Sequence, residues 1–422
     1  MRRFALILFP ILASAQPQRL TLPEAVDLAL KNNPRVDAAR LDALASAETP
    51  TQIRSNFYPQ LSANLAGSAA PDATRIAMQA LQNPTQLSKL GAGLTVSQLV
   101  TDFGRTSKLA ESAAFLNKAD QQTARATRTQ IVLQVNQAYF AALRAQAIHQ
   151  VAEKTLSTRQ TILDQVNALA ENRIRSELDV RFAQVSVEEA RLLLTQVVNE
   201  RQSADADLAV AMGLRAPQRF ELVEPDAGDT NNLDPAHWID EAIRQNPEAE
   251  QRRYVLEAAL SRVVAEKRAY YPTISAMASA GVVPAHSNLW VRDNWAAVGF
   301  NIGLPVFTGK LLSSRKAEAE LRAESARKTL SDAENRIARD ISVALLGIQN
   351  AQERVRVSQQ LVERSQQALD LARARYDLGL SSIVEFTQAQ LALINSEIQL
   401  SAARYDVELQ RAILSFHAGT TP

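Results

Sequence analysis

The chain has 422 residues and no cysteine, and its 46 basic residues nearly balance its 45 acidic ones, which leaves a formal net charge of +1. The charge balance argues against a nucleic-acid partner, because such proteins normally carry a strong positive excess. The missing cysteine excludes disulfides, thiolate metal sites and cysteine nucleophiles. Only 13 glycines and 5% aromatic residues favour long helices over a compact enzyme core.

The N-terminus is typical of a secretory signal peptide. Met1–Arg3 is basic, Phe4–Leu12 is an apolar run, and Ala13–Ala15 has the small-residue pattern of a cleavage site. We therefore expect residues 1–15 to be removed on export. The apolar run is too short to span a bilayer, and we expect no transmembrane helix elsewhere.

The chain repeats itself. Three segments recur in the same order about half a chain later: Ala29–Pro34 as Ala242–Pro247, Phe57–Pro59 as Tyr270–Pro272, and Ser176–Val180 as Ser382–Phe386. Matches in this order predict a duplication. We expect a first repeat over 16–212, a linker over 213–235 and a second repeat over 236–418.

Each repeat is predicted to contain an opening helix, two strands, a long helix, a tight tip and a return helix. In the first repeat we expect the opening helix over 22–57, strands over about 58–68 and 90–101, the long helix over 105–172, the tip over 172–178 and the return helix over 178–212. In the second repeat we expect the opening helix over 236–270, strands over about 271–283 and 295–305, the long helix over 310–376, the tip over 377–383 and the return helix over 383–416. The fold class is therefore mainly α with a small β part.

The predicted strands alternate apolar and polar residues with a period of two, as in Ile274–Val282. About ten residues is the length that a tilted strand needs to cross a membrane. Tyr58, Tyr270 and Tyr271 stand at strand starts, where a membrane-interface belt of aromatic residues would lie. Two hairpins of a water-soluble sheet remain the alternative, although Ser, Thr, Asn and Gln on the second face suit a water-filled lumen better.

The predicted long helices carry coiled-coil seams. In the second, apolar and small residues recur at spacings of three and four from Ala333 to Tyr376. At 1.5 Å per residue, each long helix would extend about 100 Å. We expect an opening and a return helix to stack end to end beside it.

Four strands per chain cannot close a barrel, because single-chain membrane barrels need about eight and an unpaired strand edge cannot face lipid. Several copies must therefore contribute to one shared barrel, and their helices would form a shared tube.

Several motifs resemble the TolC-like family of outer-membrane efflux proteins over nearly all of the chain after residue 15. They are Leu22–Pro34, the Tyr-Pro strand starts, Asp102–Arg105 and, as the most specific, Ala374–Phe386. The resemblance implies a homotrimer with a twelve-stranded barrel in the outer-membrane lipid, continuous with a periplasmic α-helical tunnel. It also implies a periplasmic adaptor and an inner-membrane pump as partners, and drugs, metals or proteins as cargo.

The inter-helix tips hold the informative polar residues. The resemblance implies a periplasmic aperture at which Glu385 and Gln388 form acidic-ring positions and Asp179 and Tyr376 help to hold the closed tip. This chain departs from the pattern, because Gln388 is neutral, Ser381 stands where an arginine can lock the closed state, and Arg173 replaces a glycine. The adaptor would face Arg173, Ser176, Leu178, Gly379, Ser381 and Ser382. Acids that merely cap helix starts remain the alternative.

No enzyme is predicted. The four histidines, His149, His237, His286 and His417, lie on different predicted elements without ligand spacing, and no catalytic, phosphate-binding or dinucleotide motif is present. We expect no catalytic residue, cofactor or metal. The predicted function is the exit duct of a tripartite efflux system. A type I protein-secretion duct of the same fold and a secreted coiled-coil scaffold without a pore remain alternatives.

Overall fold

The fold is taken from a computed structural model, which describes residues 18–68, 89–215, 220–225, 234–284 and 292–420. The predicted signal peptide, part of the linker and His286 lie outside these residues. Within them, no helix has a stretch that is both long enough and apolar enough to cross a membrane.

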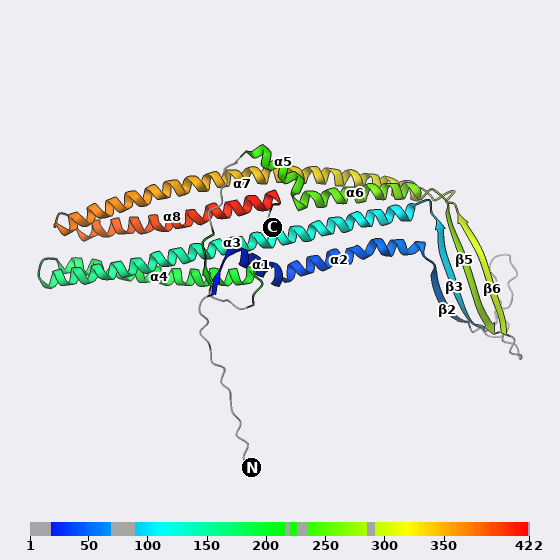
Figure 1. The fold of residues 1–422 in the computed structure, drawn as a ribbon, viewed down its shortest axis with the longest axis horizontal. Coiled ribbons are helices and arrows are strands. Elements are labelled where there is room, and N and C mark those ends of the chain that lie inside the picture. Colours follow the sequence, from blue (N-terminus) through cyan, green and yellow to red (C-terminus); the bar gives the residue numbers. More distant parts are fainter. Residues whose placement is uncertain (1–17, 69–88, 216–219, 226–233, 285–291, 421–422) are drawn as a thin grey trace, which may run out of the picture. The chain divides into compact units, whose positions relative to one another are not determined.

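The elements occur in the same order twice along the chain (Figure 1). The first set comprises α1 (Leu22–Asn32), α2 (Pro34–Arg54), β2 (Gln60–Ser68), β3 (Lys89–Thr101), α3 (Arg105–Glu171) and α4 (Glu177–Ala211). The second comprises α5 (Pro235–Gln245), α6 (Pro247–Arg268), β5 (Thr273–Pro284), β6 (Arg292–Gly303), α7 (Leu311–Asp377) and α8 (Ile383–Ala418). Two short strands, β1 (Gln18–Leu20) and β4 (Phe220–Leu222), pair in parallel, and a 3-10 turn, η1 (Ser55–Phe57), precedes β2.

The opening helix of each repeat is broken into two, where the sequence pattern predicted one. The breaks fall at Asn33 and Asn246, which have extended backbone with ψ angles of 116° and 125°. Each asparagine precedes a proline, whose ring disfavours the α conformation of the residue before it. The proline then begins the next helix, because a first-turn position needs no N–H donor.

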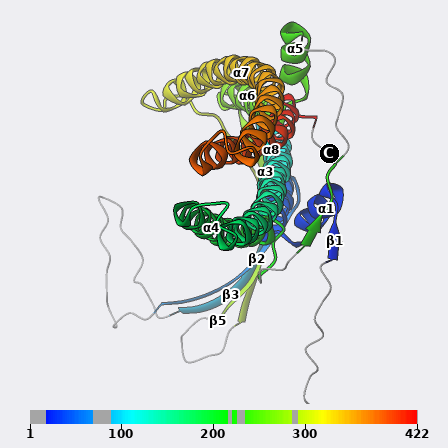
Figure 2. The ribbon, with the colours of Figure 1, turned by 90° about the vertical axis from the view of Figure 1, so that its left-hand side faces the viewer.

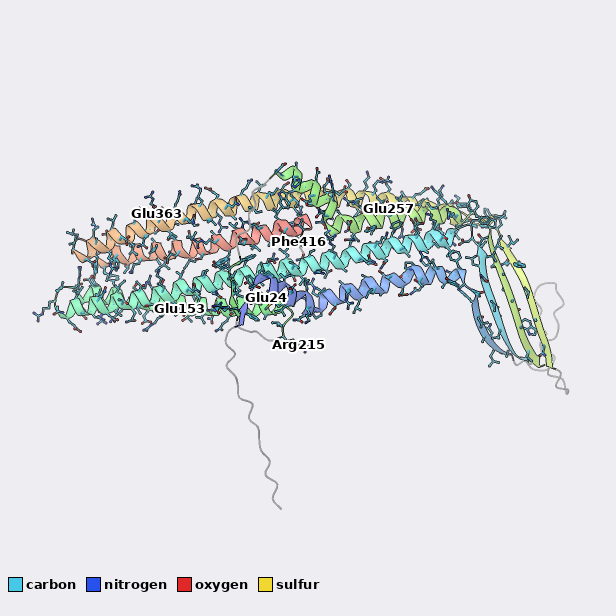
Figure 3. All side chains as sticks on the ribbon, viewed as in Figure 1. Glu24, Glu153, Arg215, Glu257, Glu363 and Phe416 are labelled. Atoms are coloured by element: carbon cyan, nitrogen blue, oxygen red, sulfur yellow. The ribbon has the colours of Figure 1, made fainter. Side chains whose placement is uncertain are left out.

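The long helices α3 and α7 have 67 residues each. In unit 1, described below, they lie beside α4 and α8 respectively (Figure 2). The predicted seams are buried, and among their members Ala152, Val187, Ile341 and Ile348 are almost completely covered. The charged residues Glu153 and Glu363 are exposed (Figure 3).

A four-stranded antiparallel sheet follows the order β2-β3-β5-β6. Its register places the alternating apolar residues of all four strands on one face, as in the row Leu61, Val96, Ala278 and Val298. The neighbouring row on the other face is Ser62, Thr95, Ser279 and Ala297. Leu61 and Val298 are 67% and 81% exposed, so the apolar face is uncovered in the single chain.

The ends of the second hairpin differ from those predicted. β5 begins at Thr273, directly after Pro272, and β6 runs over Arg292–Gly303 where 295–305 was expected. β6 ends before Pro305, since a proline has no N–H to donate to a strand ladder.

The chain forms two compact units. Unit 1 contains residues up to 39, 125–247 and from 334 onward, and unit 2 contains 40–124 and 248–333. In unit 1, the β1–β4 pair lies over a core that includes Ile131, Val135 and Leu208. The hydroxyl of Tyr139 lies 2.8 and 2.7 Å from the carbonyl oxygens of Leu20 and Val223, which ties β1 and β4 to α3.

Unit 2 contains the sheet and the helices that lead into it. On α6, Val263 packs against Ala319 and Ala323 of α7. On its other side, the carbonyl of Ala258 accepts a 2.8 Å hydrogen bond from Ser112 of α3. Small side chains and a serine at these contacts let the helices approach closely.

Candidate functional site

The first tip joins α3 to α4 and begins the return helix with a capping box. The Ser176 hydroxyl accepts a hydrogen bond from the Asp179 N–H, and the Asp179 carboxylate accepts bonds from the Ser176 N–H and hydroxyl at 3.1 and 2.9 Å. This reciprocal arrangement satisfies backbone donors at the helix start. The predicted aperture acid Asp179 thus also has a local structural role.

Each tip turns through one residue in the left-handed conformation. In the second tip this residue is Gly379, with φ of 76°, whereas in the first tip Arg173 adopts φ of 60°. The next N–H then bonds back across the turn, from Ile174 to Leu169 O and from Leu380 to Arg375 O. This is the Schellman pattern, for which glycine is the favoured residue.

An aromatic stack closes the second tip. The rings of Tyr376 at the end of α7 and Phe386 at the start of α8 are parallel within 6°, with centroids 5.6 Å apart. Both are buried with Ile383, against Val166 and Ala183 of the first helical pair. The two tips of one chain are therefore packed on a common apolar cluster.

Arg175 fastens the first tip to the second. Its guanidinium carbon lies 4.0 Å from the centre of the Tyr376 ring, and its Nη2 donates a hydrogen bond to the Tyr376 carbonyl. Arg175 was not among the site residues predicted from the sequence. It occupies the position in the first repeat that Ser381 occupies in the second, so an arginine does stand at a tip, on the opposite repeat.

The Tyr376 hydroxyl is buried and has no hydrogen-bond partner in the described chain. Burial raises the pKa of this hydroxyl, and the charge of Asp179 raises it further. Tyr376 and Asp179 are therefore close enough to interact electrostatically, although no hydrogen bond joins them here.

Glu385 pairs with Arg375, from the last turn of α7. Arg375 Nε and Glu385 Oε1 are 3.1 Å apart, and the two side chains are 56% and 47% exposed. Gln388 is exposed one turn further along α8. The predicted ring position thus carries a solvated carboxylate beside a positive charge, a pairing that a pattern along the sequence does not reveal.

The outer surface of the tips carries several large apolar side chains. Ile174, Leu178, Leu378 and Leu380 are all exposed large apolar side chains, and Ser382 is exposed beside them. The Ser381 hydroxyl, in contrast, is buried without a hydrogen-bond partner in the described chain. Of the six residues predicted to face an adaptor, Arg173, Ser176, Leu178, Gly379 and Ser382 are exposed, whereas Ser381 is half-buried with its hydroxyl covered.

The three predicted membrane-interface tyrosines are exposed at the ends of unit 2 helices. Tyr58 precedes β2, and Tyr270 and Tyr271 precede β5. The ring of Phe103, which follows β3, lies 5.8 Å from that of Tyr271. Four aromatic side chains therefore lie where the helices of unit 2 lead into the strands.

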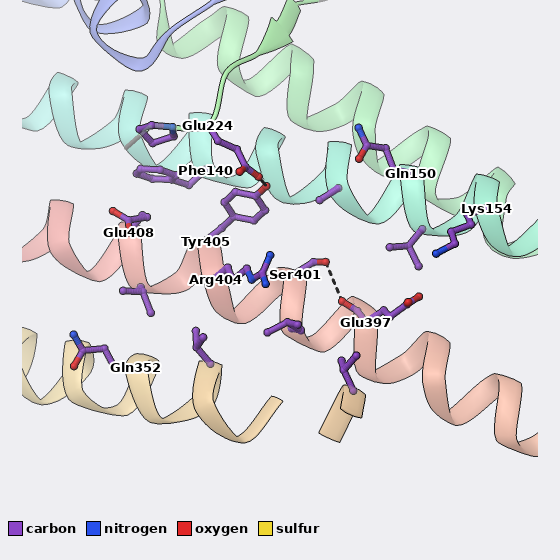
Figure 4. Close-up of a pocket in the computed structure, with 17 residues that line it drawn as sticks. Phe140, Gln150, Lys154, Glu224, Gln352, Glu397, Ser401, Arg404, Tyr405 and Glu408 are labelled. Atoms are coloured by element: carbon purple, nitrogen blue, oxygen red, sulfur yellow. Dashed lines mark hydrogen bonds between the residues drawn. The ribbon is translucent and has the colours of Figure 1, made fainter. Parts of the chain in front are cut away.

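A cavity of about 780 Å3 in unit 1 was not predicted (Figure 4). Side chains from α3, α7 and α8 line it, together with Glu224 just after β4. The Tyr405 hydroxyl donates a 2.5 Å hydrogen bond to Glu224, and burial raises the pKa of Tyr405. Burial also raises the pKa of Glu408, which pairs with Arg411. The Tyr405–Glu224 hydrogen bond connects the residues after β4 to α8, and the Glu408–Arg411 pair lies within α8.

Two histidines do have a carboxylate at helical spacing, which corrects the sequence analysis. His149 lies 3.5 Å from Glu153, and His237 lies 3.6 Å from Glu241. One imidazole and one carboxylate provide too few ligands for a structural metal ion. Among the residues that the structure describes, no three His, Asp or Glu side chains are grouped as metal ligands would be.

Comparisons with known proteins agree over both repeats. The profile of the family described as "Outer membrane efflux protein" matches residues 25–214 and 238–420. The toluene efflux pump outer membrane protein TtgC of Pseudomonas putida is 27% identical over 409 residues, which cover 93% of this chain and 82% of the relative. The outer membrane protein TolC of Vibrio cholerae is 26% identical over 417 residues, which cover 93% of this chain and 90% of the relative. A membrane protein of Pseudomonas aeruginosa has a similar fold, with a TM-score of 0.80 at 22% identity over 96% and 91% of the chains.

Proposed function

The chain belongs to the outer membrane efflux protein family, and we propose that it conducts small molecules passively as the last component of a tripartite pump. Relatives named as outer membrane proteins of toluene and antibiotic efflux pumps support the role of an outer-membrane efflux duct. The match of the family profile to both repeats carries this conclusion. Members of this family are channel proteins, and catalysis is not part of the proposal.

The assembly that we propose is a homotrimer. Four strands from each of three chains would make a twelve-stranded barrel in the outer-membrane lipid, and the helices would continue it as a periplasmic tunnel. Two features support this. In the described chain β2 and β6 are each paired along one edge only, and the apolar face of the sheet is uncovered.

The helices also present apolar rows that nothing covers in a single chain. On α4, Leu178, Val185 and Leu192 recur at every seventh position and are exposed. On α7, Val343, Val357 and Leu371 recur at twice that spacing and are exposed. Heptad spacing is the mark of a coiled-coil seam, so a neighbouring copy would cover these rows.

The partners that we propose are a periplasmic adaptor, which would contact the exposed tips, and an inner-membrane pump. The periplasmic aperture would lie at the tips, with Glu385 and Gln388 around the axis and with Arg175, Tyr376 and Asp179 holding it closed. Relatives are named for the efflux of toluene, antibiotics and cations, and an organic compound is the cargo that we propose.

The test is to co-express the chain with its adaptor and pump in a bacterium that lacks its own efflux ducts. Restored resistance to toluene or an antibiotic, together with a native mass of three chains in detergent, is the expected result. Release of a protein substrate without a change in resistance would favour the protein-secretion duct. A water-soluble monomer would contradict both the trimer and the pore.

A further inference from the structure

A polar cavity in unit 2 has the chemistry of an anion site. It has a volume of about 330 Å3 and is lined by Arg105, Arg262, Glu266, Arg315, Glu318, Ala319 and Arg322. A water molecule takes about 30 Å3 in the liquid, so a phosphate-sized group would fit. Four arginines face two glutamates, and the lining therefore has an excess of positive charge.

The two glutamates of this cavity offset its four arginines only in part. Within the described residues, Arg322 forms a close ion pair, at 2.6 Å from Glu318, and no ion pair is found for Arg105 or Arg315. Arg262 lies 3.9 Å from Glu266, too far for a hydrogen bond. The Nε of Arg105 is buried without a hydrogen-bond partner in the described chain. An arginine fork is well suited to an oxyanion such as phosphate, which it can bind through two parallel hydrogen bonds.

Glu266 adds a second requirement. Glu266 is only 5% exposed, and its Oε2 is buried with no hydrogen-bond partner in the described chain. Arg262 lies 3.9 Å from the other carboxylate oxygen, Oε1, so the charge has a cationic neighbour but Oε2 has no donor. Leaving a buried charged oxygen without a hydrogen bond is costly, so Oε2 needs a donor. A fully deprotonated anion such as sulfate would supply no donor, whereas an ammonium group next to a phosphate would supply both a donor and a positive charge.

The cavity lies where helices give way to strands. Arg105 is the first residue of α3, after the turn that follows β3, and Glu266 lies in the last turn of α6, shortly before Tyr270 and Tyr271. Arg268, the neighbouring arginine, is already used, because it donates a 3.0 Å hydrogen bond to Gly104 O.

We propose that this cavity binds a phosphate ester that carries a primary ammonium group, the chemistry of a phosphoethanolamine headgroup. Arg105, Arg262 and Arg315 would bind the phosphate oxygens, and Glu266 Oε2 would accept a hydrogen bond from the ammonium. Both a membrane lipid and a soluble ester have this chemistry.

The test is calorimetric titration of the full-length protein, purified in a phosphate-free maltoside detergent. We expect glycerophosphoethanolamine to bind and glycerophosphocholine, whose quaternary ammonium has no N–H donor, to bind at least about tenfold more weakly. Arg315→Gln and Arg105→Gln should each weaken the binding of glycerophosphoethanolamine about tenfold or more. Arg315 is exposed, so its substitution should not disturb folding. Arg327→Gln is the matched control, because this exposed arginine pairs with Glu324 on the same helix outside the cavity.

Glu266→Gln separates the two parts of the site. It should remove most of the preference for the ethanolamine ester over the choline ester, while inorganic phosphate binds at least as tightly because a negative charge is lost from the cavity. Native mass spectrometry distinguishes the sources, because a phosphatidylethanolamine molecule retained by the wild type and lost by Arg315→Gln would identify the membrane lipid. Equal binding of both esters by the wild type, or unchanged binding in both arginine variants, would overturn the proposal.

Discussion

At the scale of single residues, Arg173 is the clearest departure from local preference. A side chain in the left-handed region costs roughly 1 kcal/mol relative to glycine, and the second tip has glycine at the same place. Arg173→Gly should therefore raise the free energy of unfolding by about 1 kcal/mol, measured by thermal denaturation of the assembled protein. Gly379→Ala should lower it by a similar amount. If Arg173→Gly instead lowers the free energy of unfolding, the contacts of the guanidinium must stabilise the fold by more than the left-handed backbone costs.

Arg175 is the residue whose loss should loosen the tips. Arg175→Gln removes the cation–π contact and most of the bond to the Tyr376 carbonyl, an interaction of about 1–2 kcal/mol in a half-buried setting. We expect a higher single-channel conductance in a planar bilayer. Tyr376→Phe is the informative companion, since the ring and carbonyl remain. If Tyr376→Phe raises the conductance as much as Arg175→Gln does, the Tyr376 hydroxyl must bond to another copy. If Arg175→Gln leaves the conductance unchanged, the contact between Arg175 and Tyr376 has no part in closure.

The sequence placed Asp179 and Glu385 at the two tips, but it did not predict the partner of either side chain. Asp179 and Glu385 occupy equivalent positions, and the repeat alone assigns them equal roles. The structure separates them, because Asp179 caps its own helix through Ser176 whereas Glu385 pairs with Arg375. A pattern along one chain reports spacing, and it does not report which partner a long side chain selects.

At the scale of elements, periodicity predicted the long helices closely and their interruptions poorly. α3 and α7 begin after the turns at Gly104 and Gly309 and end within one residue of the positions expected, because turn residues mark both ends. The breaks at Asn33 and Asn246 were missed, although Asn-Pro is a boundary signal, since the apolar pattern continues across them.

Leu208 tests the core of unit 1. It is completely buried on α4, in the cluster that contains Ile131 and Val135 of α3. Leu208→Asp places an unpaired carboxylate there, which should cost several kcal/mol and reduce the yield of folded protein. Val210→Asp, two residues along the same helix and 71% exposed, is the control. Similar melting temperatures in the two variants would show that Leu208 is not in a stabilising core.

At the scale of the whole molecule, the proposed trimer rests on the sheet. Its period-two pattern predicted two chemically different faces, and the register places Leu61, Val96, Ala278 and Val298 in one apolar row. The order β2-β3-β5-β6 was not predictable, because alternation is the same whichever strands are neighbours. The closure that we propose depends on edges supplied by other copies, which no property of a single chain determines.

The charge of the proposed aperture can be tested with opposite substitutions at one ion pair. Three copies of Glu385 around an axis would favour cations, and each is partly offset by its Arg375 neighbour 3.1 Å away. Glu385→Ala should therefore shift the reversal potential in a salt gradient toward weaker cation selectivity. Arg375→Gln should shift it the other way, because the carboxylate then acts without compensation. Gln388→Ala changes no charge and serves as the control. If Glu385→Ala leaves the reversal potential unchanged, the carboxylate lies away from the path of the ions and serves only to begin α8.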